Sequence, residues 1–127
     1  MATYRQYCPV AVASEILAER WNPLIVRNLM FGADTFSAIA NGVPSMSRSM
    51  LIKRLDELHR AGVIETQLKP DGRGYNYRLT DAGADLAGVI RALGTWGERW
   101  ADVTSEQSDP ALDRPEARHW SPAQRGV

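Results

Sequence analysis

The segment at residues 69–74, Lys-Pro-Asp-Gly-Arg-Gly, constrains the fold of this chain more than any other feature of the sequence. A proline and two glycines in so short a segment indicate a tight turn rather than a continuing helix or strand. Residues 63–68 before it are rich in Val, Ile and Thr, and residues 75–79 after it carry tyrosine and leucine. Both flanks therefore predict strands, and together the three segments predict a β-hairpin with a glycine-rich tip.

Helical periodicity and helix-end signals precede this hairpin. Apolar residues from Pro9 onward predict a first helix that runs to about Arg20. Asn22 suits an N-cap and Pro23 the first position of a second helix, which Gly32 is expected to end.

Three more helices are expected. Asp34 or Thr35 can cap a short third helix, which stops at the turn signal Asn-Gly-Val-Pro of residues 41–44. Ser47 opens a fourth helix with leucines at helical spacing, and Ala-Gly closes it before the hairpin. Thr80 caps one long last helix, which is apolar along one side.

This order of elements is the outline of a winged helix-turn-helix: two short helices joined by a glycine-containing turn, then a hairpin. The predicted fold is mainly α with a small β-hairpin, with the third and fourth helices as the turn motif and residues 69–74 as the wing. We expect one domain over residues 1–102, because 127 residues leave little room for a second. In residues 103–127, Pro, Asp, Ser and Arg dominate and periodicity disappears, which predicts a C-terminal tail.

Charge has to be argued locally, because the 15 basic and 15 acidic residues of the chain cancel. Residues 44–78 contain seven basic and four acidic residues, which gives this segment a net charge of +3. A local positive charge on a recognition helix and wing is the electrostatic footprint that DNA binding requires. The alternative is a solvated helix face in a winged-helix module that binds proteins.

The predicted fourth helix and wing supply the candidate DNA-contacting residues. A recognition helix meets base edges with its N-terminal residues. Arg48 can grip O6 and N7 of guanine, a contact worth about 1–3 kcal/mol of discrimination, and Ile52 can touch a thymine methyl group. Arg73 between two glycines can enter a minor groove, or it is a solubilising turn residue. Arg54 lies on a shoulder, where it meets phosphate or a neighbouring helix. The full candidate set is Ser47, Arg48, Ser49, Ile52, Lys53, Arg54, Lys69 and Arg73.

The last helix carries more apolar surface than so small a core is expected to cover. The apolar residues predicted to form this surface are Ile90, Leu93, Trp96 and Trp100. Because monomers rarely expose such patches, these residues predict a twofold interface, formed with the first helix. The alternative is that the stripe packs only on its own domain.

Five short segments of the sequence carry a resemblance to a known family. They are Cys8-Pro9-Val10; Arg20-Trp21; residues 54–58 with 61–64; residues 77–80 with Gly83; and residues 96–100. In this order and spacing, over about residues 7–101, the chain resembles the HxlR-type family of bacterial winged-helix transcription regulators, which is related to the MarR group. The resemblance implies a homodimer that binds an operator in double-stranded DNA by its fourth helix and wing. Because no nucleophile motif, phosphate-binding glycine loop or zinc spacing appears, an enzyme is not expected. Arg48 and Ile52 replace the proline and the small polar residue common in the family, which leaves the operator sequence open.

Cys8, the only cysteine, rules out an intramolecular disulfide and suits a reducing cytoplasm. Some members of the family sense oxidants or electrophiles through a cysteine at this place, so the resemblance makes Cys8 a candidate redox sensor. A thiol near a helix N-terminus can also have a lowered pKa. The alternative is a small buried cysteine that only packs.

Other sites and locations are not indicated. Neither a signal-peptide core nor an apolar run of about 20 residues is present, so we expect a cytoplasmic protein without a membrane partner. His59 and His119 have no metal-ligand spacing, and no cofactor motif appears. Two alternatives stay open: an interaction module without specific DNA binding, and a regulator with a small-molecule effector between the first and last helices.

Overall fold

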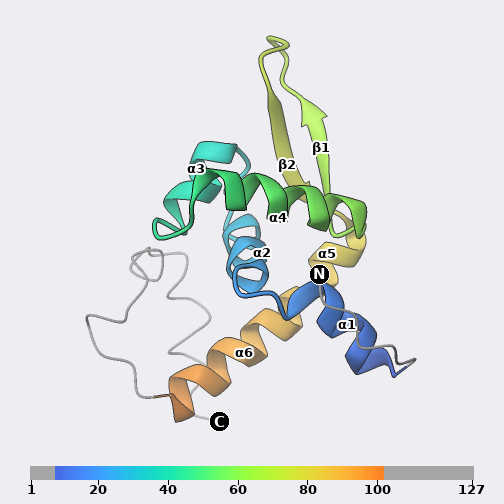
Figure 1. Cartoon of the computed structure of the whole chain (residues 1–127), viewed down its shortest axis with the longest axis vertical. Coiled ribbons are helices and arrows are strands. Elements are labelled where there is room, and N and C mark those ends of the chain that lie inside the picture. Colours follow the sequence, from blue (N-terminus) through green and yellow to red (C-terminus); the bar gives the residue numbers. More distant parts are fainter. Residues whose placement is uncertain (1–7, 102–127) are drawn as a thin grey trace.

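The computed structural model describes residues 8–101, which form six helices and one antiparallel hairpin. In chain order the elements are α1 (Pro9–Leu17), α2 (Asn22–Met30), α3 (Phe36–Asn41), α4 (Arg48–Arg60), β1 (Ile64–Leu68), β2 (Tyr75–Leu79), α5 (Asp81–Asp85) and α6 (Ala87–Trp100) (Figure 1). The predicted fold class, mainly α with a small hairpin, is confirmed. The predicted tail lies outside the described residues.

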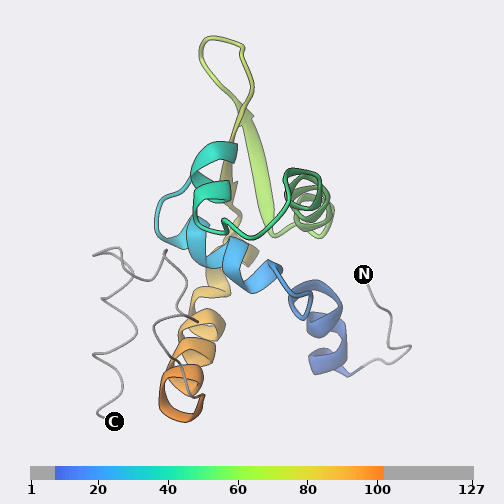
Figure 2. The same ribbon diagram turned by 60° about the vertical axis from the view of Figure 1, so that its left-hand side comes forward.

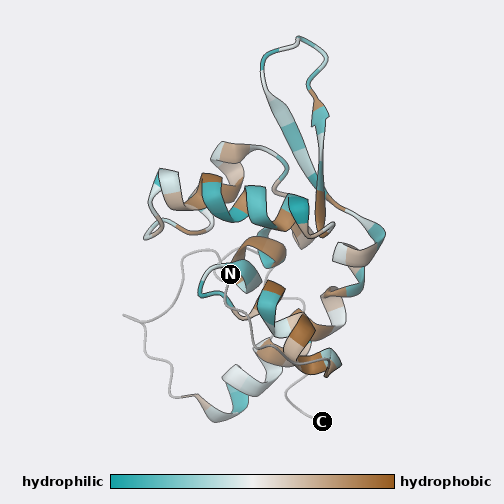
Figure 3. Ribbon diagram, turned by 45° about the vertical axis from the view of Figure 1, so that its right-hand side comes forward, coloured by the Kyte–Doolittle hydropathy of each residue, from teal (hydrophilic) through white to brown (hydrophobic). Residues whose placement is uncertain are grey.

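The hairpin and the terminal helices lie at opposite ends of the molecule. The hairpin projects from one end, whereas α1 and α6 lie at the other (Figure 1; Figure 2). Much of the hairpin is hydrophilic, and hydrophobic residues concentrate in the helices below it (Figure 3). No helix among residues 8–101 has the length and the apolar run that a membrane crossing requires.

Side-chain caps fix the start of the helices that build the turn motif. The Thr35 hydroxyl accepts a hydrogen bond from the Ala38 N–H at 3.1 Å, so α3 begins where the sequence predicted. Ser47 caps α4 in the same way, accepting from the Met50 N–H at 3.2 Å. Each bond satisfies one of the N–H groups that a helix start leaves without a partner.

The connection between α1 and α2 differs from the prediction. α1 ends at Leu17, short of Arg20, and Asn22 is the first residue of α2 rather than its cap. The buried Asn22 side chain donates to the Ile16 carbonyl at 2.7 Å. In a continuing helix the Ile16 carbonyl would accept from the Arg20 N–H. Here the Asn22 side chain replaces that N–H as the donor, which satisfies a carbonyl at the end of α1.

The single last helix expected from the sequence is two helices, α5 and α6, separated at Leu86. Thr80 caps α5 as predicted, with its hydroxyl accepting from the Gly83 N–H at 3.1 Å. The Leu86 N–H then donates to the Gly83 carbonyl at 3.0 Å, three residues back. This tighter turn interrupts the α-helical ladder.

The core surrounds α2, which packs against α3, α6 and the hairpin. Ile25 and Val26 of α2 are fully buried, and the predicted apolar side of α4 packs beside them, with Leu51, Leu55 and Leu58 buried. This core fixes α4 and the hairpin relative to each other and leaves the opposite side of α4 to solvent.

A buried polar cluster joins α2 to the end of α3. The Arg27 guanidinium donates to the Asn28 side-chain oxygen and to the Gly42 carbonyl, both at 3.0 Å, while the Asn28 amide donates to the Ile39 carbonyl at 3.2 Å. These bonds satisfy carbonyls at the C-terminal end of α3, which a helix end leaves without partners. These side chains of α2 thereby fix the position of the turn between α3 and α4.

Candidate nucleic-acid interface

The first two turns of α4 present polar side chains on the side opposite the core. Ser47, Arg48, Ser49 and Lys53 are all exposed, as predicted for a helix that offers its N-terminal residues to a partner. The Ser47 hydroxyl already caps the helix and lies 3.5 Å from the Ser49 hydroxyl. Ile52 is 52% exposed on the same helix, so its side chain is accessible to a partner.

The wing tip is held by bonds within the loop. The Gly72 N–H donates to the Lys69 carbonyl and the Lys69 N–H to the Gly74 carbonyl, both at 2.9 Å. Gly72 and Gly74 have positive φ angles of 71° and 100°, which residues with a side chain rarely adopt. The Asp71 carboxylate accepts from the Arg73 backbone N–H at 2.9 Å, and Arg73 itself is exposed.

Ion pairing separates the basic residues of this region into two groups. Arg60 pairs with Asp56 at 3.1 Å, and Arg78 pairs with Glu65 across the hairpin at 2.6 Å. The other group has no ion pair with any residue of the part of the chain that the structure describes. Its members are Arg48, Lys53, Lys69 and Arg73. Within residues 44–78, the cations without an ion pair lie on the first two turns of α4 and on the wing.

Arg54 differs from the other predicted DNA-contacting cations, because its charge is already paired within the described residues. Its side chain is only 12% exposed and pairs with Glu57 at 2.7 Å and with Glu19 at 3.5 Å. Glu19 lies between α1 and α2, so Arg54 ties α4 to the neighbouring helical connection. This agrees with the other reading of Arg54, as a residue that meets a neighbouring helix.

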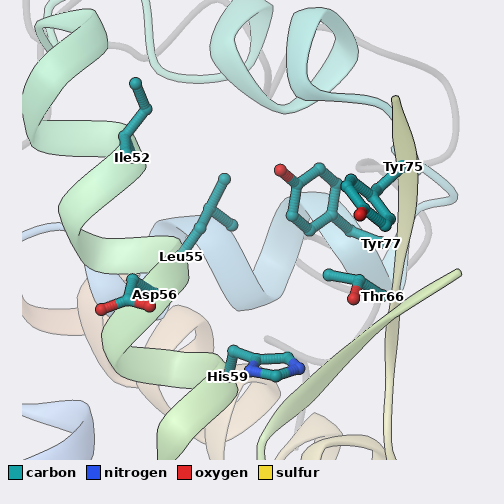
Figure 4. A pocket seen from close by; sticks show the side chains of 7 residues that line it. All are labelled: Ile52, Leu55, Asp56, His59, Thr66, Tyr75 and Tyr77. Carbon is teal, nitrogen blue, oxygen red and sulfur yellow. The ribbon is translucent and has the colours of Figure 1, made fainter. Parts of the chain in front are cut away.

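Aromatic residues between α4 and the wing were not recognised in the sequence. Tyr75 and Tyr77 of β2 face Leu55 across a hollow of about 280 Å³, with His59 at its lower edge (Figure 4). A second hollow of about 330 Å³ shares Ile52 and both tyrosines with the first. It is also lined by Thr35, Phe36, Ser37, Arg48, Lys69 and Gly74. The period of two along a strand, which puts residues 75 and 77 on one face, was the available signal.

At the opposite end of the molecule, α1 and α6 expose an apolar face. Leu93 is 50%, Trp96 64% and Trp100 67% exposed, so this part of the stripe does not pack on its own domain. Ile90, by contrast, is 4% exposed in the core, so its assignment to the interface was wrong: its side of α6 faces α2. α1 adds exposed Val10, and a groove of about 390 Å³ runs between the two helices.

Cys8 is exposed at the N-terminus of α1, so within a single chain it is not a buried packing residue. Its sulfur makes no well-formed capping hydrogen bond. The backbone N–H groups of Ala11 and, more weakly, Val10 nevertheless lower the pKa of the Cys8 thiol below its ordinary value. The thiolate therefore forms at lower pH than in an unfolded chain.

Metal binding finds no support in the described residues. Within residues 8–101, no three His, Cys, Asp or Glu side chains gather as a metal site would require. His59 is an exposed residue of α4, and His119 lies outside the described residues.

Comparison with known proteins gives this architecture its family. Residues 16–105 match the model of the HxlR-like helix-turn-helix. The chain belongs to the HxlR-like helix-turn-helix family. The HTH-type transcriptional regulator YvaP of Bacillus subtilis (strain 168) is 35% identical over 99 residues, or 76% of this chain and 92% of YvaP. YodB of the same organism, also an HTH-type transcriptional regulator, is 33% identical over 97 residues, or 75% of this chain and 87% of YodB.

Solved structures agree with this membership. The reduced form of YodB matches with a TM-score of 0.64 at 32% identity, covering 76% of this chain and 97% of YodB. The redox regulator HypR in its oxidized form matches with a TM-score of 0.69 at 25% identity, covering 76% of this chain and 100% of HypR. This HxlR-like chain is therefore a transcriptional regulator and not an enzyme, as the sequence predicted.

Proposed function

We propose that the protein is a homodimeric regulator that binds a specific DNA operator through α4 and the wing. The distribution of unpaired cations carries this proposal: Arg48 and Lys53 on α4, and Lys69 and Arg73 on the wing, have no carboxylate partner within residues 8–101. DNA phosphates can pair with these cations, and each such contact favours binding because it releases counterions from the DNA. Arg48, the first residue of α4, is the candidate for base readout.

A second copy of the chain is the proposed occupant of the apolar face on α1 and α6. The exposed tryptophans continue beyond the groove between these helices, so a small molecule in the groove would leave them uncovered. A helix of a second copy could cover the groove and the two tryptophans together. A twofold dimer of this kind would bring two recognition helices to successive major grooves, about 34–36 Å apart. Binding of a small-molecule effector in the groove between α1 and α6 is the alternative proposal for this surface.

We expect Arg48→Ala to weaken binding to a duplex selected from a random library by about 5- to 150-fold, and to relax preference at one base pair. Lys53→Ala should weaken binding to all duplexes alike, because a phosphate contact carries no sequence information. It should also reduce the slope of log K against log salt concentration by about 1. Fluorescence anisotropy titrations at several salt concentrations measure all three effects.

Arg60→Ala is the matched control, since Arg60 lies on the same helix but is already paired with Asp56. It should leave affinity and salt slope close to those of the wild type. If the affinity of the wild type for the duplex did not depend on salt, a winged-helix module that binds proteins would be favoured over a DNA-binding regulator. Equal binding by wild type, Arg48→Ala and Lys53→Ala would contradict the assignment of α4 as the recognition helix.

We further propose that Cys8 makes DNA binding sensitive to oxidants. Cys8 is exposed and its thiol pKa is lowered, and both properties favour a reactive thiolate. Among the similar structures, YodB is seen in a quinone-bound form and HypR is described as a redox regulator. The likeness of these proteins to this chain supports a redox response, and Cys8 is the only cysteine of the chain that could carry it.

Cys8 should react with iodoacetamide faster in the folded protein than in urea at about pH 7, because the lowered pKa gives a larger thiolate fraction below the ordinary thiol pKa. The advantage should disappear at high pH, where both states are fully ionised. A mild oxidant or a quinone should then change operator binding of the wild type and leave Cys8→Ser unaffected. Identical responses of both proteins would remove Cys8 from the regulatory mechanism.

A further inference from the structure

We propose that Phe36 is a positioning residue that orients Arg48 for base readout; this inference rests on the proposed DNA-binding function. The guanidinium carbon of Arg48 lies 4.5 Å from the centroid of the Phe36 ring. This distance is within the range of a cation–π interaction, in which the negative face of the ring attracts the cation. The contact joins the first residue of α3 to the first residue of α4.

The Phe36 ring is a fixed platform. Phe36 is partly buried and packs against the hydrophobic core. Its backbone begins α3 directly after Thr35, whose hydroxyl caps that helix. The other end of α3 is held by the hydrogen bonds of Arg27 and Asn28 to the Gly42 and Ile39 carbonyls. A side chain anchored in this way can restrain a mobile partner.

Arg48 is the exposed partner, and the ring contacts it without occupying its N–H donors. Arg48 is exposed, and no carboxylate within residues 8–101 pairs with it. An exposed arginine has rotamer entropy to lose on binding, and stacking reduces that loss. A carboxylate would bind the N–H donors that guanine O6 and N7 need, whereas a phenyl ring accepts no conventional hydrogen bond and leaves all five N–H groups available.

The open side of Arg48 is also the side where DNA would lie. Arg48 and Phe36 line the hollow of about 330 Å³ together with Ile52 and Lys69. Arg48, in contact with the ring, therefore borders unfilled space between α4 and the wing. This geometry orients Arg48 before the DNA arrives.

A double-mutant cycle with Phe36→Leu and Arg48→Ala tests the proposal, because leucine keeps an apolar side chain and removes the aromatic face. Phe36→Leu should weaken binding of the Arg48 protein to the selected duplex about two- to fivefold, the fold-change that corresponds to an exposed cation–π interaction. It should also reduce discrimination at the base pair that Arg48 reads. In the Arg48→Ala background the same change should have no effect. Phe36→Tyr, which keeps the aromatic face, should restore affinity and discrimination.

Two further measurements separate this role from a structural one. Thermal unfolding of every variant reports core damage, and damage alone would weaken binding equally in both Arg48 backgrounds. Proton chemical shifts of the Arg48 side chain in the free protein report the ring directly, and the upfield shift that stacking causes should vanish in Phe36→Leu. Equal losses in both backgrounds, or no loss in either, would overturn the role of Phe36 while leaving DNA binding intact. Absence of salt-dependent binding in the wild type would overturn the proposed function itself.

Discussion

Trp96→Glu combined with Trp100→Glu is expected to convert the protein from a dimer into monomers and to weaken operator binding about 100- to 10,000-fold. Both side chains are about two-thirds exposed on α6 in the single chain. Each tryptophan that a partner covers contributes a large buried area, and its truncation costs about 3–5 kcal/mol where it is fully packed. A monomer would bind one half-site at a time and would lose the gain from simultaneous contact with two.

Leu68→Glu is the control for the oligomeric state, because Leu68 is an apolar residue with 56% exposure on the hairpin, at the other end of the molecule (Figure 1). It should remain dimeric. Sedimentation velocity at micromolar concentration measures the oligomeric state, and anisotropy titration measures DNA binding. A compact wild-type monomer would contradict the dimer, as would a double tryptophan variant that stays dimeric and binds DNA normally.

The features that the sequence predicted well are those fixed by local chemistry. Thr35, Ser47 and Thr80 cap helices because their hydroxyls bond N–H groups three residues on, and this depends only on nearby residues. The buried side of α4 followed from leucine spacing, and the hairpin followed from its glycine-rich tip.

The errors arose where partners distant in sequence decide the outcome. Arg54 pairs with Glu19, 35 positions earlier, and no local pattern distinguishes that pairing from an arginine free to bind phosphate. Ile90 and Leu93 belong to the same apolar stripe, yet Ile90 is buried in the core whereas Leu93 is 50% exposed, and this difference depends on how α6 packs on the rest of the domain. The contact of Phe36 with Arg48 likewise depends on how α3 and α4 pack.

Gly83→Ala is expected to lower the free energy of unfolding by about 3 kcal/mol, at the upper end of the cost of overpacking. Gly83 is buried in α5, where a Cβ atom would overlap the Val63 carbonyl oxygen and lie 3.0 Å from Leu79 Cδ2. The Val63 carbonyl cannot move aside cheaply, because it accepts from the Thr80 N–H at 3.0 Å, and the Thr80 hydroxyl donates to the neighbouring Gly62 carbonyl at 2.6 Å. Relief of the overlap would therefore break the junction that joins the hairpin to α5.

Ala82→Ser provides the comparison, since it also adds a single heavy atom to α5 but at an exposed neighbouring position. Its stability should stay within about 0.5 kcal/mol of the wild type, as is usual for surface substitutions. Urea denaturation followed by circular dichroism measures both variants, and Gly83→Ala should also lose operator binding at temperatures where the wild type is folded. Equal stability of the two variants would mean that α5 can move away from the base of the hairpin, and the wing would then not be held at a fixed position relative to α6.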